Sequence, residues 1–308
     1  MLASRLRFGD KIGIIAPSNP ITEDLMGDFL RGVNFIEEMG FEVELGHNIY
    51  ANSLAYSAKP EEKAADIHQM FRNPGIKAIL CAQGGNTSNS CLPLLDWNLI
   101  KNNPKIFLGI SDISVLLNAI YQKAGLITYH GNDVIWGFGK SPAEYEKSVF
   151  INRFVQGTKD IKESPANNRL TIIAGEAEGR LLGGNLRCFL KLTGTEYFPQ
   201  VDKFILFIEG MLNSLDRADS LLTQLQQIGL LERAQGIILG HIEGLDNLPE
   251  RQGSFEEVLL RKLNRRIPVL KTFDFGHNCP NTILPVGAIV SFNTDKKEIL
   301  IRENLLNE

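Results

Sequence analysis

The amino-acid sequence predicts an α/β protein of two domains, the first built around a mostly parallel sheet. In the first half, short apolar runs alternate with amphipathic helical patterns, an order that favours parallel strands joined by helices. Composition turns polar between about residues 140 and 170, and shorter strand patterns follow from Thr171. A chain of 308 residues, 44% of them hydrophobic, can bury a full core, and its length favours two domains.

Three apolar runs and one segment of alternating apolar and acidic residues, 41–45, predict strands in the first half, and the amphipathic segments between them predict helices. Helices are expected from about Glu23 to Gly40 and from Pro60 onward, where a proline and two glutamates suit a first turn. Strands are expected at residues 11–16, 41–45, 76–82 and 126–129. Ligands of parallel sheets bind at the carboxyl ends of strands, where residues 16–18, residues 83–85 and Ser111 fall.

The second half begins after a polar segment. A helical pattern over residues 143–154 is followed by residues 156–169, whose composition is typical of a linker. We therefore place an N-terminal domain at residues 1–155, a linker at 156–174 and a C-terminal domain at 175–308. In the C-terminal domain, strands are expected at residues 204–208, 236–240 and 288–292, and helices at 218–228 and 255–263.

Charge and composition argue against several classes of protein. The net charge is −4 and no block of Lys and Arg occurs, so we expect no nucleic-acid partner. Residues 1–11 lack the apolar core of a signal peptide, and no apolar run approaches the ~20 residues of a membrane span. The four cysteines show no CxxC spacing, and no dinucleotide fingerprint or P-loop is present. We expect a cytoplasmic protein without membrane partner, metal or cofactor.

The segment 105–113, KIFLGISDI, is the most informative local pattern. An apolar run ends at Gly109, and Ser111 then precedes a helical pattern with apolar residues at positions 113, 116, 117, 120 and 121. Ser111 is therefore expected on a strand-to-helix turn, as in a nucleophile elbow, although Ile113 stands where such an elbow usually has glycine. A serine before a helix is more often an N-cap, and the local sequence alone favours that role.

A nucleophilic serine needs a base, and the base needs an acid that orients it. The available bases are His47, His68, His130, His241 and His277. The first two lie in polar surroundings, and the other three follow predicted strands or apolar stretches. Glu209 ends an apolar strand and is either the acid of a site or a surface group. The residues alone thus propose a Ser/His/Glu hydrolase without selecting its members.

Two glycine-rich segments are candidate loops of the site. Residues 84–90, GGNTSNS, could supply a backbone N–H to an oxyanion. Residues 179–185, GRLLGGN, could let the backbone approach a ligand closely, or could simply turn the chain into a helix. From these loops we take Asn86, Gly184 and Asn185 as candidate substrate-binding residues.

Eight segments in order along the chain resemble the LD-carboxypeptidase family of serine peptidases. The family contains murein tetrapeptide carboxypeptidases and microcin-C immunity peptidases. The segments are KIGIIAPS (11–18), QGGNTSNSCLPLLDW (83–97), NPKIFLGISDIS (103–114), GLITYHGN (125–132), EGRLLGGNL (178–186), ILFIEG (205–210), GIILG (236–240) and FGHNCPNTILPVG (275–287). Several such motifs in one order are far more specific than any single motif.

The resemblance implies a catalytic triad of Ser111 as nucleophile, His277 as base and Glu209 as acid. It implies an oxyanion hole formed by the backbone N–H groups of Gly85 and Asp112. It also implies a Rossmann-like N-terminal domain with a parallel sheet, a smaller C-terminal α/β domain and an active site between the two. A homodimer without metal or cofactor is expected.

For the substrate, the resemblance leaves two alternatives. We favour cleavage of an LD-peptide bond with release of D-alanine from a murein-type tetrapeptide; the other is amide cleavage in a peptidyl or aminoacyl nucleotide. The loop GGNTSNS resembles the microcin-immunity branch more closely. That branch stacks the nucleotide base on a tryptophan of the inter-domain segment, whereas residues 164–175 here contain none, the two tryptophans being Trp97 and Trp136.

Two departures from the family pattern bear on the shape of the pocket. Ile110 stands where an aromatic residue is usual, and Gly210 stands where a second acid usually follows the first. A protein of another class, a non-catalytic binder of small ligands with Ser111 as a helix cap, is the remote alternative.

Overall fold

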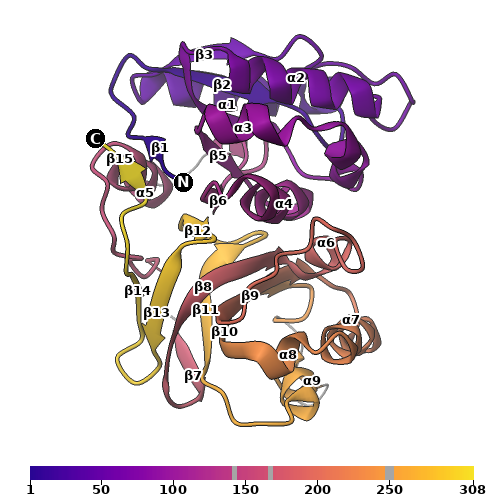
Figure 1. Ribbon diagram of the computed structural model, residues 1–308, viewed down its shortest axis with the longest axis vertical. Helices are drawn as coiled ribbons and strands as arrows, with labels where there is room; N and C mark the ends of the chain where they lie inside the picture. Colours follow the sequence, from indigo (N-terminus) through magenta and orange to yellow (C-terminus); the bar gives the residue numbers. More distant parts are fainter. Residues whose placement is uncertain (141–143, 166–168, 247–252) are drawn as a thin grey trace.

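Two lobes, each built around a β-sheet, form the computed structural model, which describes residues 1–140, 144–165, 169–246 and 253–308. The N-terminal lobe lies above the C-terminal lobe in Figure 1, with helix α4 (Ser114–Ala124) at their junction. One continuous cluster of buried hydrophobic side chains extends through both lobes. The lobes are therefore packed against each other rather than merely linked.

The N-terminal lobe contains a six-stranded sheet in the order β12-β6-β5-β4-β2-β3. Its strands are β2 (Lys11–Ile15), β3 (Glu42–Leu45), β4 (Ile76–Cys81), β5 (Ile106–Gly109), β6 (Thr128–His130) and β12 (Leu284–Val286). The first five are parallel, with Ile14 in register with both Leu45 and Leu80. The apolar runs of β2, β4, β5 and β6 are buried because helices pack against the sheet, whereas β3, at the edge of the sheet, is partly exposed.

Helices and short 3₁₀ turns connect these strands. They are η1 (Glu23–Leu25), α1 (Met26–Glu38), α2 (Pro60–Arg72), η2 (Ser88–Leu94), α3 (Trp97–Asn102), η3 (Ser111–Ile113), α4, η4 (Phe138–Lys140) and α5 (Glu144–Phe154). Helix α2 begins where the sequence predicted it, because Pro60 fits the first turn and the Glu62 carboxylate accepts the Lys59 N–H at 2.7 Å.

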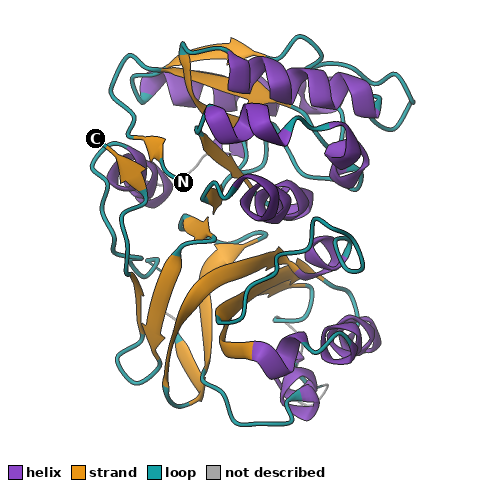
Figure 2. Cartoon of the chain, in the orientation of Figure 1, coloured by secondary structure: helices purple, strands orange, loops and turns teal. Residues whose placement is uncertain are grey.

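The C-terminal lobe contains a seven-stranded sheet in the order β14-β13-β8-β9-β10-β11-β7. The strands are β7 (Leu170–Ile173), β8 (Glu176–Asn185), β9 (Phe204–Met211), β10 (Ala234–Glu243), β11 (Val269–Gly276), β13 (Ile289–Asn293) and β14 (Glu298–Ile301). Strands β8 to β11 are parallel, and the others are antiparallel. Helices α6 (Leu186–Leu190), α7 (Leu215–Gln227), α8 (Leu230–Arg233) and α9 (Phe255–Lys262) gather on one side of it in Figure 2.

Two pairings cross between distant parts of the chain. Strand β12 follows β11 in the C-terminal half but pairs antiparallel with β6, at the edge of the N-terminal sheet. Near the termini, β1 (Ala3–Ser4) and β15 (Leu306–Asn307) form a short parallel pair beside α5. The C-terminal half of the chain therefore completes the sheet of the N-terminal lobe.

The predicted fold class is confirmed: a parallel-sheet N-terminal region is followed by a second sheet domain. One local prediction is wrong, since the loop expected at residues 179–185 belongs to strand β8. Gly183 and Gly184 have φ of +132° and +126°, so this strand follows a path that side chains rarely allow. Strand β6 begins two residues later than expected. The first residue of the predicted helix 143–154 lies outside the described residues, as do positions within the linker at 156–174, and the domain boundaries stay a prediction.

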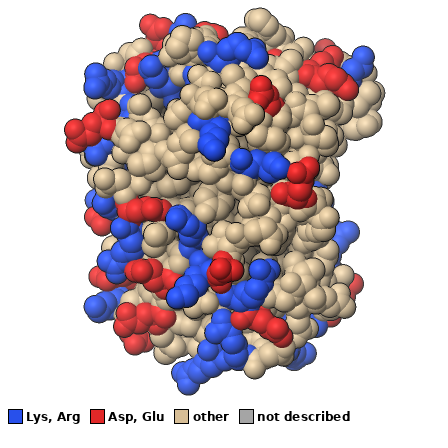
Figure 3. Space-filling model, in the orientation of Figure 1, with Lys and Arg blue, Asp and Glu red and all other residues tan. Residues whose placement is uncertain are grey.

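The face of the molecule seen in Figure 3 has no single charge character. In Figure 3 acidic and basic side chains are interspersed over both lobes of the visible face. Within the described part of the chain, no helix combines the length and the apolarity that a bilayer crossing requires.

Candidate active site

Ser111 lies on a strained turn after strand β5, as the first residue of the helical segment η3–α4. Its φ is +62°, a left-handed conformation that non-glycine residues rarely adopt and that costs about 1–3 kcal/mol. No side chain caps η3 or α4, so Ser111 does not serve as the predicted N-cap. The turn instead holds the hydroxyl at the carboxyl edge of the N-terminal sheet, which is what a nucleophile elbow requires.

The loop after strand β4 packs directly against this turn. A methyl group on Gly84 would lie 2.6 Å from Ser111 Cβ, 2.9 Å from Ser111 Oγ and 3.2 Å from Asp112 N. Gly85 has φ of +144°, and a side chain there would collide with the amide of Asn19. Both positions therefore require glycine. The proposed oxyanion donors, the N–H groups of Gly85 and Asp112, belong to two segments in contact beside Ser111.

Asp112 connects the turn that carries Ser111 to both lobes through its side chain. Its buried carboxylate accepts hydrogen bonds from Ser18 Oγ at 2.6 Å and Ser88 N at 2.8 Å, and it forms an ion pair with Lys191 of the C-terminal lobe. Burial acts to raise the pKa of Asp112, but the Lys191 charge and these hydrogen bonds outweigh it and lower the pKa. Asp112 thus stays ionised and fixes the backbone that presents Ser111.

Glu209 and His277 come from neighbouring parts of the C-terminal sheet and form a close pair. Glu209 is near the end of β9 and wholly buried, while His277 directly follows β11 and is largely buried. His277 Nδ1 lies 2.6 Å from Glu209 Oε2, so that a protonated Nδ1 donates to the carboxylate. This contact joins two of the three residues that the family resemblance predicts to form a catalytic triad.

Opposing effects set the ionisation of this pair. Burial acts to raise the pKa of Glu209, but the charge and hydrogen bond of His277 and the contribution of His130 together outweigh it and hold the pKa well below its usual range. Burial acts to lower the pKa of His277, but the charge and hydrogen bond of Glu209 raise it above its ordinary value. A buried carboxylate therefore orients the imidazole and stabilises its protonated form.

A second histidine faces the other oxygen of Glu209. His130, wholly buried, places Nε2 3.8 Å from Glu209 Oε1, which is too long for a hydrogen bond, so it acts on the carboxylate through electrostatics. Its ring packs edge-on against Phe207 and Phe275. Glu209 is thus flanked by two imidazoles, a feature that the sequence did not predict.

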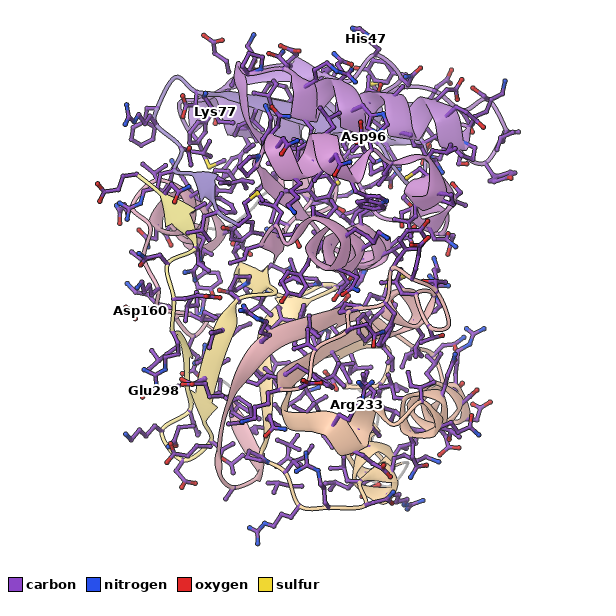
Figure 4. All side chains as sticks on the ribbon, in the orientation of Figure 1. His47, Lys77, Asp96, Asp160, Arg233 and Glu298 are labelled. Carbon is purple, nitrogen blue, oxygen red and sulfur yellow. The ribbon has the colours of Figure 1, made fainter. Side chains whose placement is uncertain are left out.

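The other three histidines have different roles. His241 Nδ1 lies 2.7 Å from the carbonyl oxygen of His277 and so supports the backbone of the proposed base. His68 Nε2 accepts the N–H of Asp96 at the start of α3. His47 lies at the outer edge of the N-terminal lobe, far from the junction between lobes (Figure 4).

A cleft of about 880 Å³ between the lobes exposes both Ser111 and His277. Ser111 contributes from the N-terminal lobe and His277 from the C-terminal lobe. Among the described residues no hydrogen bond joins their side chains; such bonds are often long until a substrate is bound. The cleft is also lined by Gly85, Asn86, Asp133, Trp136 and Arg187.

Trp136 supplies an aromatic surface from a segment where none was expected. It is 54% exposed, and its Nε1–H donates to Gln83 Oε1 at 3.1 Å, beside the Gly84–Gly85 loop. Its backbone N–H donates to Asp133 Oδ1 at 2.7 Å, and burial raises the pKa of Asp133 to about 6. The inter-domain segment that lacks tryptophan includes positions outside the described residues, 166–168.

Two of the predicted substrate-binding residues lie away from the cleft surface. Asn185 accepts the Cys188 N–H at the start of α6, and its own N–H donates to Ser114 Oγ at 2.9 Å. A side chain on Gly184 would collide with Ser114. Both residues pack the lobes together, whereas Asn86 lines the cleft. Their assignment to substrate binding stays a prediction.

Comparison with known proteins fits this architecture. Residues 12–131 match the LD-carboxypeptidase N-terminal domain, and residues 178–292 match the LD-carboxypeptidase C-terminal domain. The microcin C7 self-immunity protein MccF of Escherichia coli is 32% identical, over 100% of this chain and 97% of that protein. A probable murein peptide carboxypeptidase of Bacillus subtilis is 32% identical, over 96% of this chain and 92% of that protein.

Solved structures agree in fold over the whole chain. MccF in complex with aspartyl sulfamoyl adenosine superposes with a TM-score of 0.93 at 32% identity, covering 100% of both chains. The muramoyltetrapeptide carboxypeptidase of Oxalobacter formigenes superposes with a TM-score of 0.78 at 25% identity, covering 94% of this chain and 97% of that one. Two family domains matched in order, with full-length relatives, leave one conclusion: this chain belongs to the LD-carboxypeptidase family and is a serine-type carboxypeptidase.

Proposed function

We propose that Ser111, His277 and Glu209 act as a catalytic triad that cleaves an LD-peptide bond and releases D-alanine from a murein-type tetrapeptide. The observation that carries the proposal is the 2.6 Å contact between Glu209 Oε2 and His277 Nδ1, with His277 exposed to the same cleft as Ser111. The strained φ of Ser111 supports it, because such strain is common where a side chain is presented for chemistry.

In this mechanism His277 Nε2 takes the proton of Ser111 Oγ as the oxygen attacks the scissile carbonyl. Glu209 holds the Nδ1 tautomer and stabilises the imidazolium. The N–H groups of Gly85 and Asp112 donate to the oxyanion, and removal of one such donor typically costs about 3 kcal/mol in the barrier. His277 then protonates the leaving amine, and water, deprotonated by the same imidazole, hydrolyses the acyl-enzyme.

Amide cleavage in an aminoacyl nucleotide is the second candidate. Its support is Trp136, whose exposed ring in the cleft could stack a base, although it stands in a segment other than the one that supplies tryptophan in the microcin-immunity branch. Stacking on an aromatic side chain is worth about 1–3 kcal/mol. The related MccF forms a complex with a compound of this class, aspartyl sulfamoyl adenosine.

A side-by-side hydrolysis assay separates the candidates. The parent protein and Ser111→Ala are incubated with the tetrapeptide and with an aminoacyl sulfamoyl adenosine, and products are quantified by mass spectrometry. We expect D-alanine release by the parent and a loss of several orders of magnitude in the variant. Turnover of the adenosine compound alone would favour the second candidate, and full activity of a folded Ser111→Ala would refute the triad.

Covalent labelling tests the chemistry without a substrate. A fluorophosphonate probe should modify Ser111 in the parent and leave Ser111→Ala unmodified. A non-catalytic binder would not react, so an unlabelled parent protein would revive that alternative.

A further inference from the structure

Arg187 is a cationic side chain on the wall of the cleft to which the mechanism assigns no role. It lies in the five-residue helix α6, directly after strand β8, and its side chain is exposed. It lines the same cleft as Ser111 and His277. Asn185, which precedes α6, is in register with Glu209 on the neighbouring strand β9. Arg187 is thus close in the fold to the acid of the proposed triad.

The contacts of α6 show which way Arg187 faces. Lys191 follows α6 in helical conformation and bonds both the Asp112 carboxylate and the carbonyl oxygen of Asn86, the latter at 2.8 Å. Residues four apart lie on the same face of a helix. Arg187 therefore occupies the same face one turn earlier, the face turned toward the nucleophile turn and the glycine loop.

The charges around the cleft leave Arg187 available to an anion. Among the described residues the cationic side chains that line it are Lys140 and Arg187. Lys140 forms an ion pair with Asp28 and lies 5.1 Å from the centre of the Trp136 ring. No carboxylate of the described residues forms an ion pair with Arg187. Within the described part of the chain, Arg187 is thus the cation of this cleft that has no ion-pair partner.

We propose that Arg187 binds the C-terminal carboxylate of the substrate and so confines cleavage to the last residue of a peptide. The guanidinium presents paired N–H donors that match the two oxygens of a carboxylate. An enzyme that removes one terminal residue must hold the carboxylate next to the scissile bond, and Arg187 lines the same cleft as Ser111 with no side-chain hydrogen bond to any described residue. The assignment rests on the proposed function, which makes Ser111 and His277 the reacting centre.

Binding measurements test this role separately from catalysis. In a Ser111→Ala background, calorimetry compares the murein-type tetrapeptide with its C-terminal amide, in the presence and absence of Arg187→Gln. We expect the acid to bind about tenfold or more tighter than the amide, a preference typical of hydrogen bonds to a charged group. Arg187→Gln should bring the two affinities together by weakening the acid alone, and Arg187→Lys should restore part of the difference.

Two matched variants complete the test. Arg233→Gln removes an exposed arginine from the end of α8, within the C-terminal lobe (Figure 4), and should leave the acid–amide ratio unchanged. Lys140→Gln removes the other cation of the cleft. The inference is overturned if the ratio persists in Arg187→Gln, if it collapses in Lys140→Gln instead, or if the parent background shows no preference. Because no variant here has a nucleophile, failure of the triad would appear only in the hydrolysis assay.

Discussion

Replacing Gly84 by alanine would place a methyl carbon 2.6 Å from Ser111 Cβ and 2.9 Å from Ser111 Oγ. Carbon atoms in ordinary contact are separated by about 3.5–4.0 Å, so one of the two segments must move by about 1 Å. A shift of that size at a reacting group can cost about 100-fold in kcat. The same methyl group would lie 3.2 Å from Asp112 N, so the proposed oxyanion donor would be displaced as well.

We therefore expect Gly84→Ala to lower kcat by at least about 100-fold, with a loss of unfolding free energy of about 1–3 kcal/mol, as is usual for an overpacked site. Steady-state kinetics and urea unfolding would measure the two effects. Gly210→Ala is the matched control, because a methyl group there has its nearest described neighbour, Leu212 Cγ, at 3.8 Å, an ordinary contact. A folded Gly84→Ala with parental kcat would refute the assignment of Ser111 as nucleophile at this turn.

Three further outcomes follow from the buried charges. Glu209→Gln should lower kcat by about 10⁴-fold. It should also shift the acid limb of the pH profile of kcat/KM to lower pH, because the Glu209 carboxylate raises the pKa of His277. An unshifted acid limb would contradict the pairing of Glu209 with His277. In the parent protein, the pKa of His277 is higher in the folded than in the unfolded state, so the His277–Glu209 pair stabilises the fold at low pH. This contribution is lost as the pH rises through the folded pKa. In urea unfolding, Glu209→Gln should therefore be more destabilising at pH 5.5 than at pH 9. His130→Phe should raise the pKa of Glu209, because His130 contributes to holding it low, and an NMR titration of the Glu209 carboxyl group measures this directly; an unchanged carboxyl titration would limit His130 to packing. Lys191→Met should lower the unfolding free energy, measured in urea, by about 3 kcal/mol, because it leaves the Asp112 carboxylate buried without its cation. Adding Asp112→Asn should recover part of that loss. Strictly additive losses in the two variants would mean that the two side chains do not interact.

The strand-to-helix turn at Ser111 could be predicted from the sequence because its signals are local. The apolar run, Gly109 and the helical spacing after the serine all lie within a few neighbouring residues. The pairing of Glu209 with His277 joins residues 68 positions apart, and no local pattern selects it among five histidines. Only the resemblance to a family picked out that pair.

The differences at strand β8 and at Trp136 have a common cause. Glycine-rich composition predicts a loop, but Gly183 and Gly184 lie in a strand, and they are glycines because neighbouring backbone and Ser114 leave no room for side chains. Trp136 lies outside the inter-domain segment where the family resemblance places a stacking tryptophan, yet the chain folds the loop after β6 into the cleft. In both cases the deciding contacts come from residues distant in the sequence, which composition does not record.

Strand β12 has a consequence for how the protein is made. The sheet that presents Ser111 gains its outer strand from residues 284–286, which leave the ribosome long after the serine does. Until then β6 would be left with an unpaired edge, which favours association with other chains. His277 is in turn tethered on both sides, by β11 in one sheet and by β12 in the other, over a short stretch of chain. A nascent chain therefore cannot assemble a working hydrolase early, and an N-terminal fragment carrying the elbow alone should be both inactive and prone to aggregate.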